Sequence, residues 1–411
     1  MKTILVSAYA IQPYKGSEDG MGWNFTLQIA KHNKVIAITR ENNREWIEKY
    51  QSEHPDARYA NITFLYFDLP YWMRFWKKGG RGAMLYYYMW QRGIVSFIRK
   101  QTLEFDIAHN LNFHNDWTPS FLWKLNKPFV WGPVGHHSYI PHQYLSFWKD
   151  KLKDTLTWLV KKYFWNVSSN LRKTKQKAQH IICMNTSAAK VLKLKDKFSI
   201  IPSVATQDFG WHEEVDFSKE FNIISAGRFV PLKGFDLSIQ AFAGFFHKLS
   251  ERERRRVKLT LVGSGRMKDQ MERDIKALGI ENHVEIVSWI ARTELMDMFK
   301  KSALFLFPSH EGAGMVVAEA LSFGVPVVCL DNDGPGEFIT PECGIAVQPQ
   351  SYKGTVDGLS QAIGQLFFQP EKHRKVRQAA RKRFEDAFDW DNRSEQLHAI
   401  YQEVLQKEAV T

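Results

Sequence analysis

The feature of this sequence that most constrains its fold is a repeated alternation of short apolar segments with longer segments of helical periodicity. Short apolar runs bounded by glycine, proline or polar clusters are typical of buried strands, and their alternation with helices predicts parallel sheets covered on both faces. The chain is therefore expected to be an α/β protein of the doubly wound type. The expected strands are TILVSAY, KVIAITR, ITFLYF, DIAHNL, PFVWG and HIICMN in the first half, and FNIISAGRF, KLTLVGSG, VEIVSWI, ALFLFP and VPVVCL in the second.

The alternation is interrupted once, at residues 200–220, where IIPSVATQDFGWHEEVDFSKE shows no periodicity and reads as a linker. A chain of 411 residues also exceeds the size of one ordinary hydrophobic core. We expect an N-terminal domain at 1–205, a C-terminal domain at 206–385, and a helical tail at 386–411 that can cross back to the first domain. Such sheets bind ligands at the carboxyl ends of their strands, which favours a cleft between two domains that face each other.

Charge is distributed unevenly between the two halves. The whole chain carries 56 Lys and Arg against 44 Asp and Glu, a formal balance of +12. Residues 1–205 hold 30 basic residues against 14 acidic ones, a balance of +16, and the rest holds 26 against 30, a balance of −4. The asymmetry predicts an anionic partner for the first half, which can be nucleic acid, a membrane surface or a phosphorylated acceptor. No nucleic-acid-binding motif is found, so we expect no nucleic-acid partner.

A membrane surface is favoured by the segment SFWKDKLKDTLTWLVKKYFWNVSSNLRK at residues 146–173. Its apolar residues fall on one helical stripe and its lysines lie around that stripe, a pattern typical of interfacial helices. The alternative, a core-packed helix with a lysine face, stays open. The stripe consists of Trp148, Leu152, Leu156, Leu159, Tyr163 and Val167, and the lysines are Lys149, Lys151, Lys153, Lys161 and Lys162.

The sequence also bears on the compartment. No run of roughly 18 apolar residues exists, so no membrane-spanning helix is expected. The opening MKTILVSAYA has no cleavage pattern and reads as a first strand rather than a signal peptide. The three cysteines, Cys183, Cys329 and Cys343, are scattered and lack metal-ligand spacing, which indicates reduced thiols in the cytosol. We therefore expect a cytoplasmic protein that associates peripherally with a membrane.

The stretch SHEGAGMVVAEALSFGVPVV carries Glu311 and Glu319, eight positions apart across a glycine-rich bend. The bend follows the apolar run ALFLFP and precedes a helical pattern that ends at Gly324 and Pro326. Backbone N–H groups at such a helix start can bind an anion. An exposed glutamate on an amphipathic helix is the alternative for Glu319. The segment around it is apolar almost throughout, however, so a buried carboxylate there needs a partner.

Three further segments end strands of the second half with glycine and charge. The loop SAGRFVPLKG places Arg228 and Lys233 five residues apart, and two such cations can straddle a diphosphate that Gly227 lets come close. Solvated surface charges are the alternative. Gly263 ends the strand of LVGSG, a weak signal by itself. The backbone of Trp289 and Ile290 in VSWI can read the edge of a base, and a core tryptophan is the alternative.

Taken in order, these segments resemble the donor-binding domain of retaining glycosyltransferases of family 4, the glycosyl transferases group 1. The resemblance spans about residues 221–340 and rests on GRFVPLKG, LVGSG, VSWI, PSHEGAGMVVAEALSFGVPVV and GPGEFI. It implies the GT-B architecture, with two Rossmann-like doubly wound domains that face each other across a cleft. It also implies a hexosyl transfer from a nucleotide sugar with retention of anomeric configuration and without a committed protein nucleophile.

The resemblance assigns roles to individual residues. Glu311 would hold hydroxyls of the donor sugar, and Glu319 the ribose hydroxyls of the nucleotide. Arg228 and Lys233 would stabilise the departing diphosphate in place of a metal, so neither a metal nor another cofactor is expected. The triplet DND at 331–333 offers a metal-binding alternative, which we disfavour because it follows a late strand. The backbone that would meet the diphosphate belongs to Gly314, Met315 and Val316.

The first half resembles a subset of the same family. The loop PYKGSEDGMGW would place Gly16, Ser17 and Glu18 against the diphosphate and the acceptor, although a plain turn is the alternative. His109, at the end of an expected strand, would contact the donor sugar near the reacting carbon; a structural histidine is the alternative. The segment VWGPVGHHSYIP resembles GPVGGG of that subset, with His136 and His137 in place of two glycines. Their part in acceptor binding stays open.

The expected function is that of a retaining, metal-independent glycosyltransferase. It would move a sugar from a nucleotide sugar, with UDP favoured, to a glycan or lipid-linked acceptor at the cytoplasmic membrane face, as in cell-surface polysaccharide or glycolipid assembly. Two alternatives remain: a nucleotide-sugar epimerase of the same fold, which has no use for a basic, aromatic first domain, and a non-catalytic nucleotide-binding scaffold. The sequence specifies neither the sugar nor the acceptor nor the linkage.

Overall fold

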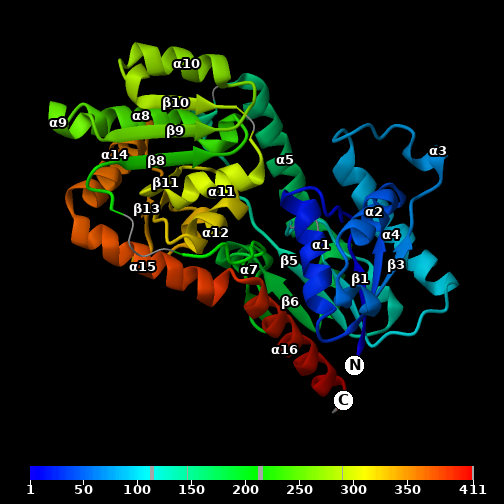
Figure 1. Ribbon diagram of the computed structural model, residues 1–411. Coiled ribbons are helices and arrows are strands. Elements are labelled where there is room, and N and C mark those ends of the chain that lie inside the picture. Colours follow the sequence, from blue (N-terminus) through cyan, green and yellow to red (C-terminus); the bar gives the residue numbers. More distant parts are fainter. Residues whose placement is uncertain (112–114, 146, 212–215, 289, 410–411) are drawn as a thin grey trace. The chain divides into compact units, whose positions relative to one another are not determined.

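The computed structural model describes residues 1–111, 115–145, 147–211, 216–288 and 290–409, and the chain forms two compact units (Figure 1). Unit 1 consists of Met1–His136, Leu159–Ser203 and Trp390–Thr411, and unit 2 of His137–Trp158 and Val204–Asp389. The segment His137–Trp158 belongs to the second unit although it interrupts the first in sequence. The C-terminal helix from Trp390 belongs to the first unit.

Unit 1 contains a seven-stranded parallel sheet of order β3-β2-β1-β4-β5-β6-β7. The order reverses between β1 and β4, as in a doubly wound sheet with crossovers on both faces. Its strands are β1 (Thr3–Ser7), β2 (Lys34–Thr39), β3 (Ile62–Tyr66), β4 (Ile107–Asn110), β5 (Phe129–Val134), β6 (His180–Cys183) and β7 (Phe198–Ile200).

The helices of unit 1 cover this sheet. The long helix α4 faces the core with Tyr86, Trp90 and Ile94, which are fully buried. The C-terminal helix α16 packs against α1, where the rings of Phe25 and Trp390 meet edge to face at 5.4 Å. The helices are α1 (Ser17–Ile29), α2 (Arg44–Glu53), α3 (Tyr71–Arg74), α4 (Ala83–Lys100), α6 (Ser169–Lys177), α7 (Thr186–Leu192) and α16 (Trp390–Ala409).

Unit 2 contains a six-stranded parallel sheet of order β10-β9-β8-β11-β12-β13, which reverses between β8 and β11. Its strands are nearly continuous apolar runs because helices cover both faces. The strands are β8 (Phe221–Ala226), β9 (Val257–Val262), β10 (Val284–Val287), β11 (Leu304–Phe307), β12 (Val327–Leu330) and β13 (Gly344–Val347).

Among the helices of unit 2, α8 and α14 pack against each other and carry many phenylalanines of the core. Helix α12, which carries Glu319, packs against α11 and α15. The helices are α8 (Phe235–Phe246), α9 (Glu251–Arg254), α10 (Lys268–Ala277), α11 (Arg292–Lys300), α12 (Met315–Ser322), α13 (Pro335–Phe338), α14 (Tyr352–Phe368) and α15 (Pro370–Ala387).

The predicted α/β class with two parallel sheets is confirmed, and each of the eleven expected strands corresponds to an observed one. Two strands were not expected, β7 and β13, which are the last strands of their sheets. An edge strand pairs on one side only and β7 has just three residues, so its sequence does not carry the long apolar run that identified the central strands.

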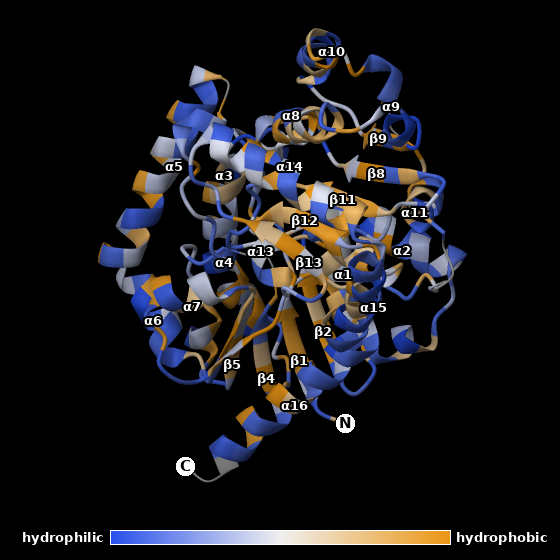
Figure 2. Cartoon of the chain, turned by 90° about the vertical axis from the view of Figure 1, so that its left-hand side faces the viewer, coloured by the Kyte–Doolittle hydropathy of each residue, from blue (hydrophilic) through white to orange (hydrophobic). Residues whose placement is uncertain are grey.

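Helix α5 (Trp148–Val167) begins in unit 2 and ends in unit 1. It alternates polar and apolar colours along its length (Figure 2). All six residues of the expected apolar stripe are exposed, between 51% for Leu152 and 67% for Trp148. The stripe is therefore not buried, although Phe164 and Trp165 of the same helix pack against the core of unit 1. Within the described ranges, none of the helices combines the length and apolar character needed to cross a membrane.

Candidate functional site

The site of unit 2 lies where the strand order reverses, between β8 and β11. Crevices at the carboxyl ends of strands form at such switch points because the loops leave in opposite directions. The loop at 227–234 follows β8, and the loop at 308–314 follows β11. Leu232 joins the two loops, since its carbonyl accepts hydrogen bonds from the His310 N–H at 2.9 Å and the Ser309 hydroxyl at 3.3 Å.

Lys233 and Glu311 form an ion pair across these loops. The Lys233 Nζ lies 2.6 Å from Glu311 Oε2, and the two side chains are only 12% and 18% exposed. The Lys233 stem lies over Gly227, where an added Cβ would be 3.3 Å from Cδ and Cε, and its Nζ lies 5.0 Å from the ring centre of Phe307. Folding thus brings together two residues that sequence analysis placed at one ligand. Arg228, in the same loop, is exposed.

The N-terminus of α12 lies in the same loop cluster. Gly314 is its N-cap residue; no side chain caps the helix, and its first turn contains no acidic residue. Uncapped N–H groups and the positive end of the helix dipole suit an anion. Met315 and Val316, which begin the helix, are half-buried. The Gly312 N–H, just before the helix, donates to His137 Nε2 at 3.0 Å.

Glu319 lies inside α12, is 4% exposed, and pairs with a residue that sequence analysis missed. Arg292 Nη2, from the first residue of α11, lies 2.6 Å from Glu319 Oε1. Burial raises the pKa of Glu319, and the charge of Arg292 opposes that rise. The apolar sequence around Glu319 signalled that a partner was needed but not which one. Ile290, two residues before Arg292, is half-buried, and Trp289 lies outside the described residues.

Gly227 and Gly263 have a structural explanation of their own. Both have positive φ, +152° and +148°, and a Cβ on Gly263 would lie 1.9 Å from the Gly227 carbonyl oxygen. No side chain fits at that distance, so glycine is required by the packing of these two loops. This requirement holds whether or not a ligand contacts either residue.

In unit 1, helix α1 begins at Ser17, with Gly16 as its N-cap residue. A Cβ on Gly16 would meet nothing within 4 Å, so no close approach within the protein requires glycine there. The first turn contains Glu18 and Asp19, whose carboxylates suit the hydroxyls of a ligand better than its phosphates. The side chain of Ser17 lies outside the described residues.

The surroundings of His109 support the structural alternative rather than contact with the donor sugar. His109 is fully buried in β4, with Nδ1 2.7 Å from the Tyr401 hydroxyl and Nε2 2.7 Å from the Gly132 carbonyl oxygen. Burial lowers its pKa to about 4, so it is neutral at pH 7. Both ring nitrogens are occupied by the core, which makes His109 a structural histidine. Tyr401 belongs to α16, which the strand pattern could not connect to β4.

His136 and His137 have different surroundings. His136 Nδ1 lies 2.8 Å from Asp116 Oδ2, and its backbone N–H and carbonyl both bond to the Asn185 side chain, at 3.1 and 3.0 Å. His137 begins the segment that belongs to unit 2.

The 331–333 triplet is tied to the Glu311 loop. The side-chain amide of Asn332 donates to the Ser309 carbonyl at 2.7 Å, and its oxygen accepts from the Gly334 N–H at 3.1 Å.

Part of the chain matches a known protein family. The model of the family described as glycosyl transferases group 1 matches residues 210–383, which contain the whole loop cluster of unit 2. An uncharacterized glycosyltransferase of Methanocaldococcus jannaschii is 26% identical over 203 residues, and the match covers 47% of this chain and 50% of that protein. The chain therefore spans about half the length of this curated relative.

Two further likenesses bear on the ligand. A GDP-mannose-dependent monoacylated alpha-(1-6)-phosphatidylinositol monomannoside mannosyltransferase of Corynebacterium glutamicum is 27% identical over 183 residues, covering 43% of this chain and 45% of that protein. The crystal structure of Anabaena HepE in complex with UDP matches with a TM-score of 0.62 and 16% identity, covering 98% of this chain and all of that one. At this identity the likeness concerns the fold, which is the GT-B fold with its two parallel-sheet units.

Proposed function

Because residues 210–383 of this chain match the model of the glycosyl transferases group 1 family, we propose that the protein is a retaining glycosyltransferase. It would transfer a sugar from a nucleotide-diphosphate sugar to a glycan or lipid-linked acceptor. The observation that carries the proposal is the Lys233–Glu311 pair at the switch point of unit 2, beside the uncapped start of α12. A cation, a carboxylate and open N–H groups at one place supply what a sugar diphosphate requires.

In this proposal Lys233 and Arg228 stabilise the diphosphate as it leaves, and the first amides of α12 bind its oxygens. The leaving diphosphate gains negative charge in the transition state, so preorganised positive groups lower the barrier without a metal. The carboxylate of Glu311 accepts hydrogen bonds from sugar hydroxyls, and that of Glu319 from the ribose. The leaving phosphate helps to deprotonate the acceptor hydroxyl on the same face, which retains the anomeric configuration.

We propose UDP rather than GDP as the nucleotide. The solved HepE structure, which this chain matches over 98% of its length, holds UDP. The GDP-mannose-dependent relative of Corynebacterium, 27% identical over 183 residues, is the argument for GDP, so the choice needs a direct test. A panel of UDP-glucose, UDP-galactose, UDP-N-acetylglucosamine and GDP-mannose, read out by thermal stabilisation, distinguishes the two bases.

The acceptor is proposed to lie at the cytoplasmic face of an anionic membrane. Residues 1–205 carry a balance of +16 against −4 for the rest of the chain. The exposed apolar stripe of α5, with five lysines on the same helix, also supports an anionic membrane as the partner. Lysines attract anionic lipids, and an apolar face can enter the interface.

The proposal is tested by three single variants, Arg228→Ala, Lys233→Ala and Glu311→Ala. Each is expected to cut transfer by about 10²-fold or more, the scale seen when one charge-stabilising group is removed. A matched control is Lys258→Ala, because Lys258 and Glu285 form an exposed pair in unit 2 with the same 2.6 Å separation. The control should keep its activity. Near-normal turnover in both the Arg228 and Lys233 variants would place the diphosphate elsewhere.

Metal independence and stereochemistry are tested on the wild-type protein. Turnover is expected to survive EDTA, and a complete loss that Mg²⁺ or Mn²⁺ restores would overturn the metal-free proposal. NMR of the product should show the anomeric configuration of the donor. Release of an epimerised sugar nucleotide without transfer would instead identify an epimerase.

A further inference from the structure

Residues 70–82 of unit 1 connect β3 to α4 and expose large aromatic side chains to solvent. Tyr71, Trp72 and Phe75 are 74%, 71% and 60% exposed. Three such side chains within five residues leave an apolar surface that soluble proteins normally cover. The same segment carries four basic residues, Arg74, Lys77, Lys78 and Arg81, and no acidic one.

The exposure is not the result of a loose segment, because the opposite side of it is packed. Met73 and Trp76 lie against the core of unit 1, and the Trp76 ring sits so close to Gly82 that a Cβ there would be 2.4 Å away. A tight turn closes the segment, with the Arg81 N–H donating to the Lys78 carbonyl at 2.9 Å. The face with Met73 and Trp76 is thus fixed against the core, and the face with the three exposed aromatic side chains is held in solvent.

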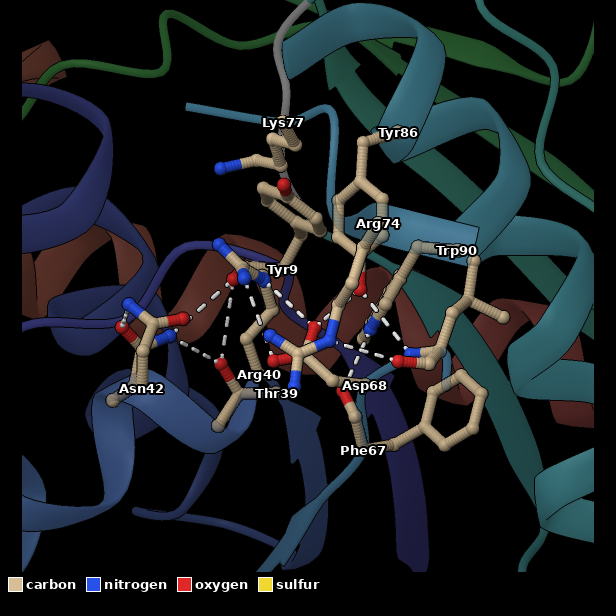
Figure 3. A network of polar contacts seen from close by, with 12 residues as sticks. Tyr9, Thr39, Arg40, Asn42, Phe67, Asp68, Arg74, Lys77, Tyr86 and Trp90 are labelled. Atoms are coloured by element: carbon tan, nitrogen blue, oxygen red, sulfur yellow. Dashed lines mark hydrogen bonds and ion pairs between the residues drawn. The ribbon is translucent and has the colours of Figure 1, made fainter. Parts of the chain in front are cut away.

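A buried polar network fixes the base of the segment (Figure 3). Arg40 donates to both oxygens of Asp68, at 2.9 and 3.4 Å, and the Tyr86 hydroxyl donates to the same carboxylate at 2.5 Å. The Arg40 guanidinium lies over the rings of Tyr9 and Tyr86, at 5.2 and 5.1 Å from their centres. The side chains of Arg40 and Asp68 are 13% and 5% exposed, so this pair is shielded from water.

The network also satisfies the backbone where the chain leaves β3. The Leu69 N–H donates to the Tyr86 hydroxyl at 3.2 Å, and the Leu69 carbonyl accepts from Arg74 Nε at 2.9 Å. The Phe67 carbonyl accepts from Trp90 Nε1 at 2.8 Å. Side chains of α3 and α4 therefore determine the direction in which residues 70–82 leave the sheet, and that direction presents the aromatic side chains to solvent.

We propose that residues 70–82 are a second membrane-binding element, which inserts Tyr71, Trp72 and Phe75 into the interface of an anionic bilayer. Aromatic rings of this kind favour the level of the lipid headgroups, and basic residues beside them are attracted to anionic lipids. The complementary charge, four basic residues with no acid, argues for this occupant. The inference rests on the proposed function only for the choice of a membrane surface, and not on any transfer activity.

The test is co-sedimentation of the full chain with vesicles of phosphatidylcholine that contain about 30 mol% phosphatidylglycerol, compared with phosphatidylcholine alone. The double variant Trp72→Ser/Phe75→Ser is expected to lower the partition coefficient by about tenfold or more, because the rings no longer enter the interface. Lys78→Gln/Arg81→Gln should lower it by about 10- to 30-fold at low salt, and by less as salt rises.

Matched variants separate this element from α5 and from general surface effects. Phe368→Ser removes a side chain of similar exposure, 54%, from unit 2 and should change nothing. Leu159→Ser/Tyr163→Ser removes part of the α5 stripe, so its loss should add to that of the 70–82 variants. Trp72→Phe should keep the binding while it lowers the quenching of tryptophan fluorescence by brominated lipid.

The proposal would be overturned by wild-type binding of the Trp72→Ser/Phe75→Ser variant, by equal binding to neutral vesicles, or by no binding of the wild type. A lipid-free dimer that this variant abolishes would assign the surface to a second copy and also overturn it. Calorimetry with UDP on the same variants keeps the two proposals apart. Failure of the wild type to bind any sugar nucleotide would count against the proposed function and leave the vesicle result standing.

Discussion

Two well-shielded ion pairs at the carboxyl ends of strands, Lys233–Glu311 in unit 2 and Arg40–Asp68 in unit 1, differ in what else they touch. Lys233 and Glu311 in unit 2 meet through one contact of 2.6 Å, beside a helix start that no side chain caps. Arg40 and Asp68 in unit 1 meet through two contacts, and the carboxylate also accepts from Tyr86.

A shielded ion pair does not by itself mark a ligand site. The position in the sheet separates the two pairs: Lys233 and Glu311 lie at the switch point between β8 and β11, whereas Arg40 and Asp68 follow β2 and β3, away from the switch point of their sheet. The two pairs also differ in how many contacts their carboxylates accept. In the proposed function the first pair would exchange partners with a ligand, whereas the second holds the base of residues 70–82.

The largest expected effect comes from exchanging the cation of each pair for methionine. Lys233→Met should cut transfer by about 10²-fold or more while the urea midpoint changes little, because Glu311 keeps some contact with water. Arg40→Met should destabilise unit 1 by about 3–5 kcal/mol, since it leaves the Asp68 carboxylate buried without its cation. Urea unfolding and turnover, measured on both variants, check this crossed pattern. If both variants lost stability, or if both lost only turnover, the distinction between the two pairs would be wrong.

The next effect concerns the buried His109. Burial lowers its pKa to about 4, below the ordinary 6.5, so the unfolded chain takes up the proton first. The contribution of neutral His109 to the free energy of unfolding is fully present above pH 6.5. It is lost as pH falls toward 4, by about 3 kcal/mol in all. The difference in urea stability between wild type and His109→Gln should therefore shrink from pH 7 to pH 4. A constant difference would mean that His109 is not the neutral core residue described above.

A smaller effect is expected at the Arg292–Glu319 pair of unit 2. Burial raises the pKa of Glu319 and Arg292 opposes that rise, so Arg292→Gln should raise it further. Affinity for UDP should then fall at a higher pH on acidification than in the wild type, because a protonated carboxyl accepts ribose hydrogen bonds poorly. Calorimetry with UDP and 2′-deoxy-UDP between pH 8 and 5 measures this. An unshifted pH profile, or no preference for UDP in the wild type, would remove Glu319 from the ribose.

The smallest effect is predicted at the start of α1. Gly16→Ala should leave stability within about 0.5 kcal/mol of wild type, because an added Cβ would meet nothing within 4 Å. Gly20→Ala is the contrasting control, since its Cβ would lie 2.4 Å from the Lys15 carbonyl oxygen and should destabilise the chain. A loss of transfer in Gly16→Ala without a loss of stability would indicate that a ligand, rather than the protein, comes close at this position.

Much of the architecture was already determined by the local pattern of apolar residues. The central strands of both sheets are buried on both faces, so each requires a continuous apolar run such as LFLF in β11. The glycine bend between β11 and α12, with its two glutamates, was equally visible, because its residue types follow from local backbone demands. The strands β7 and β13 escaped detection, because β7 has just three residues and neither sequence carries an apolar run as long as that of β11.

Only the tertiary structure decided which residues meet. The partner of Glu319 is Arg292, 27 positions earlier, and the partner of His109 is Tyr401, in a helix that returns to unit 1 from the end of the chain. A histidine at a strand end reads the same in sequence whether it faces a ligand or the core. The answer depended on the chain path of α16, which no local pattern encodes. The sequence by itself thus determined the strands and the residue types of the loops, while folding determined their partners, because burial and pairing are properties of segments far apart in the chain.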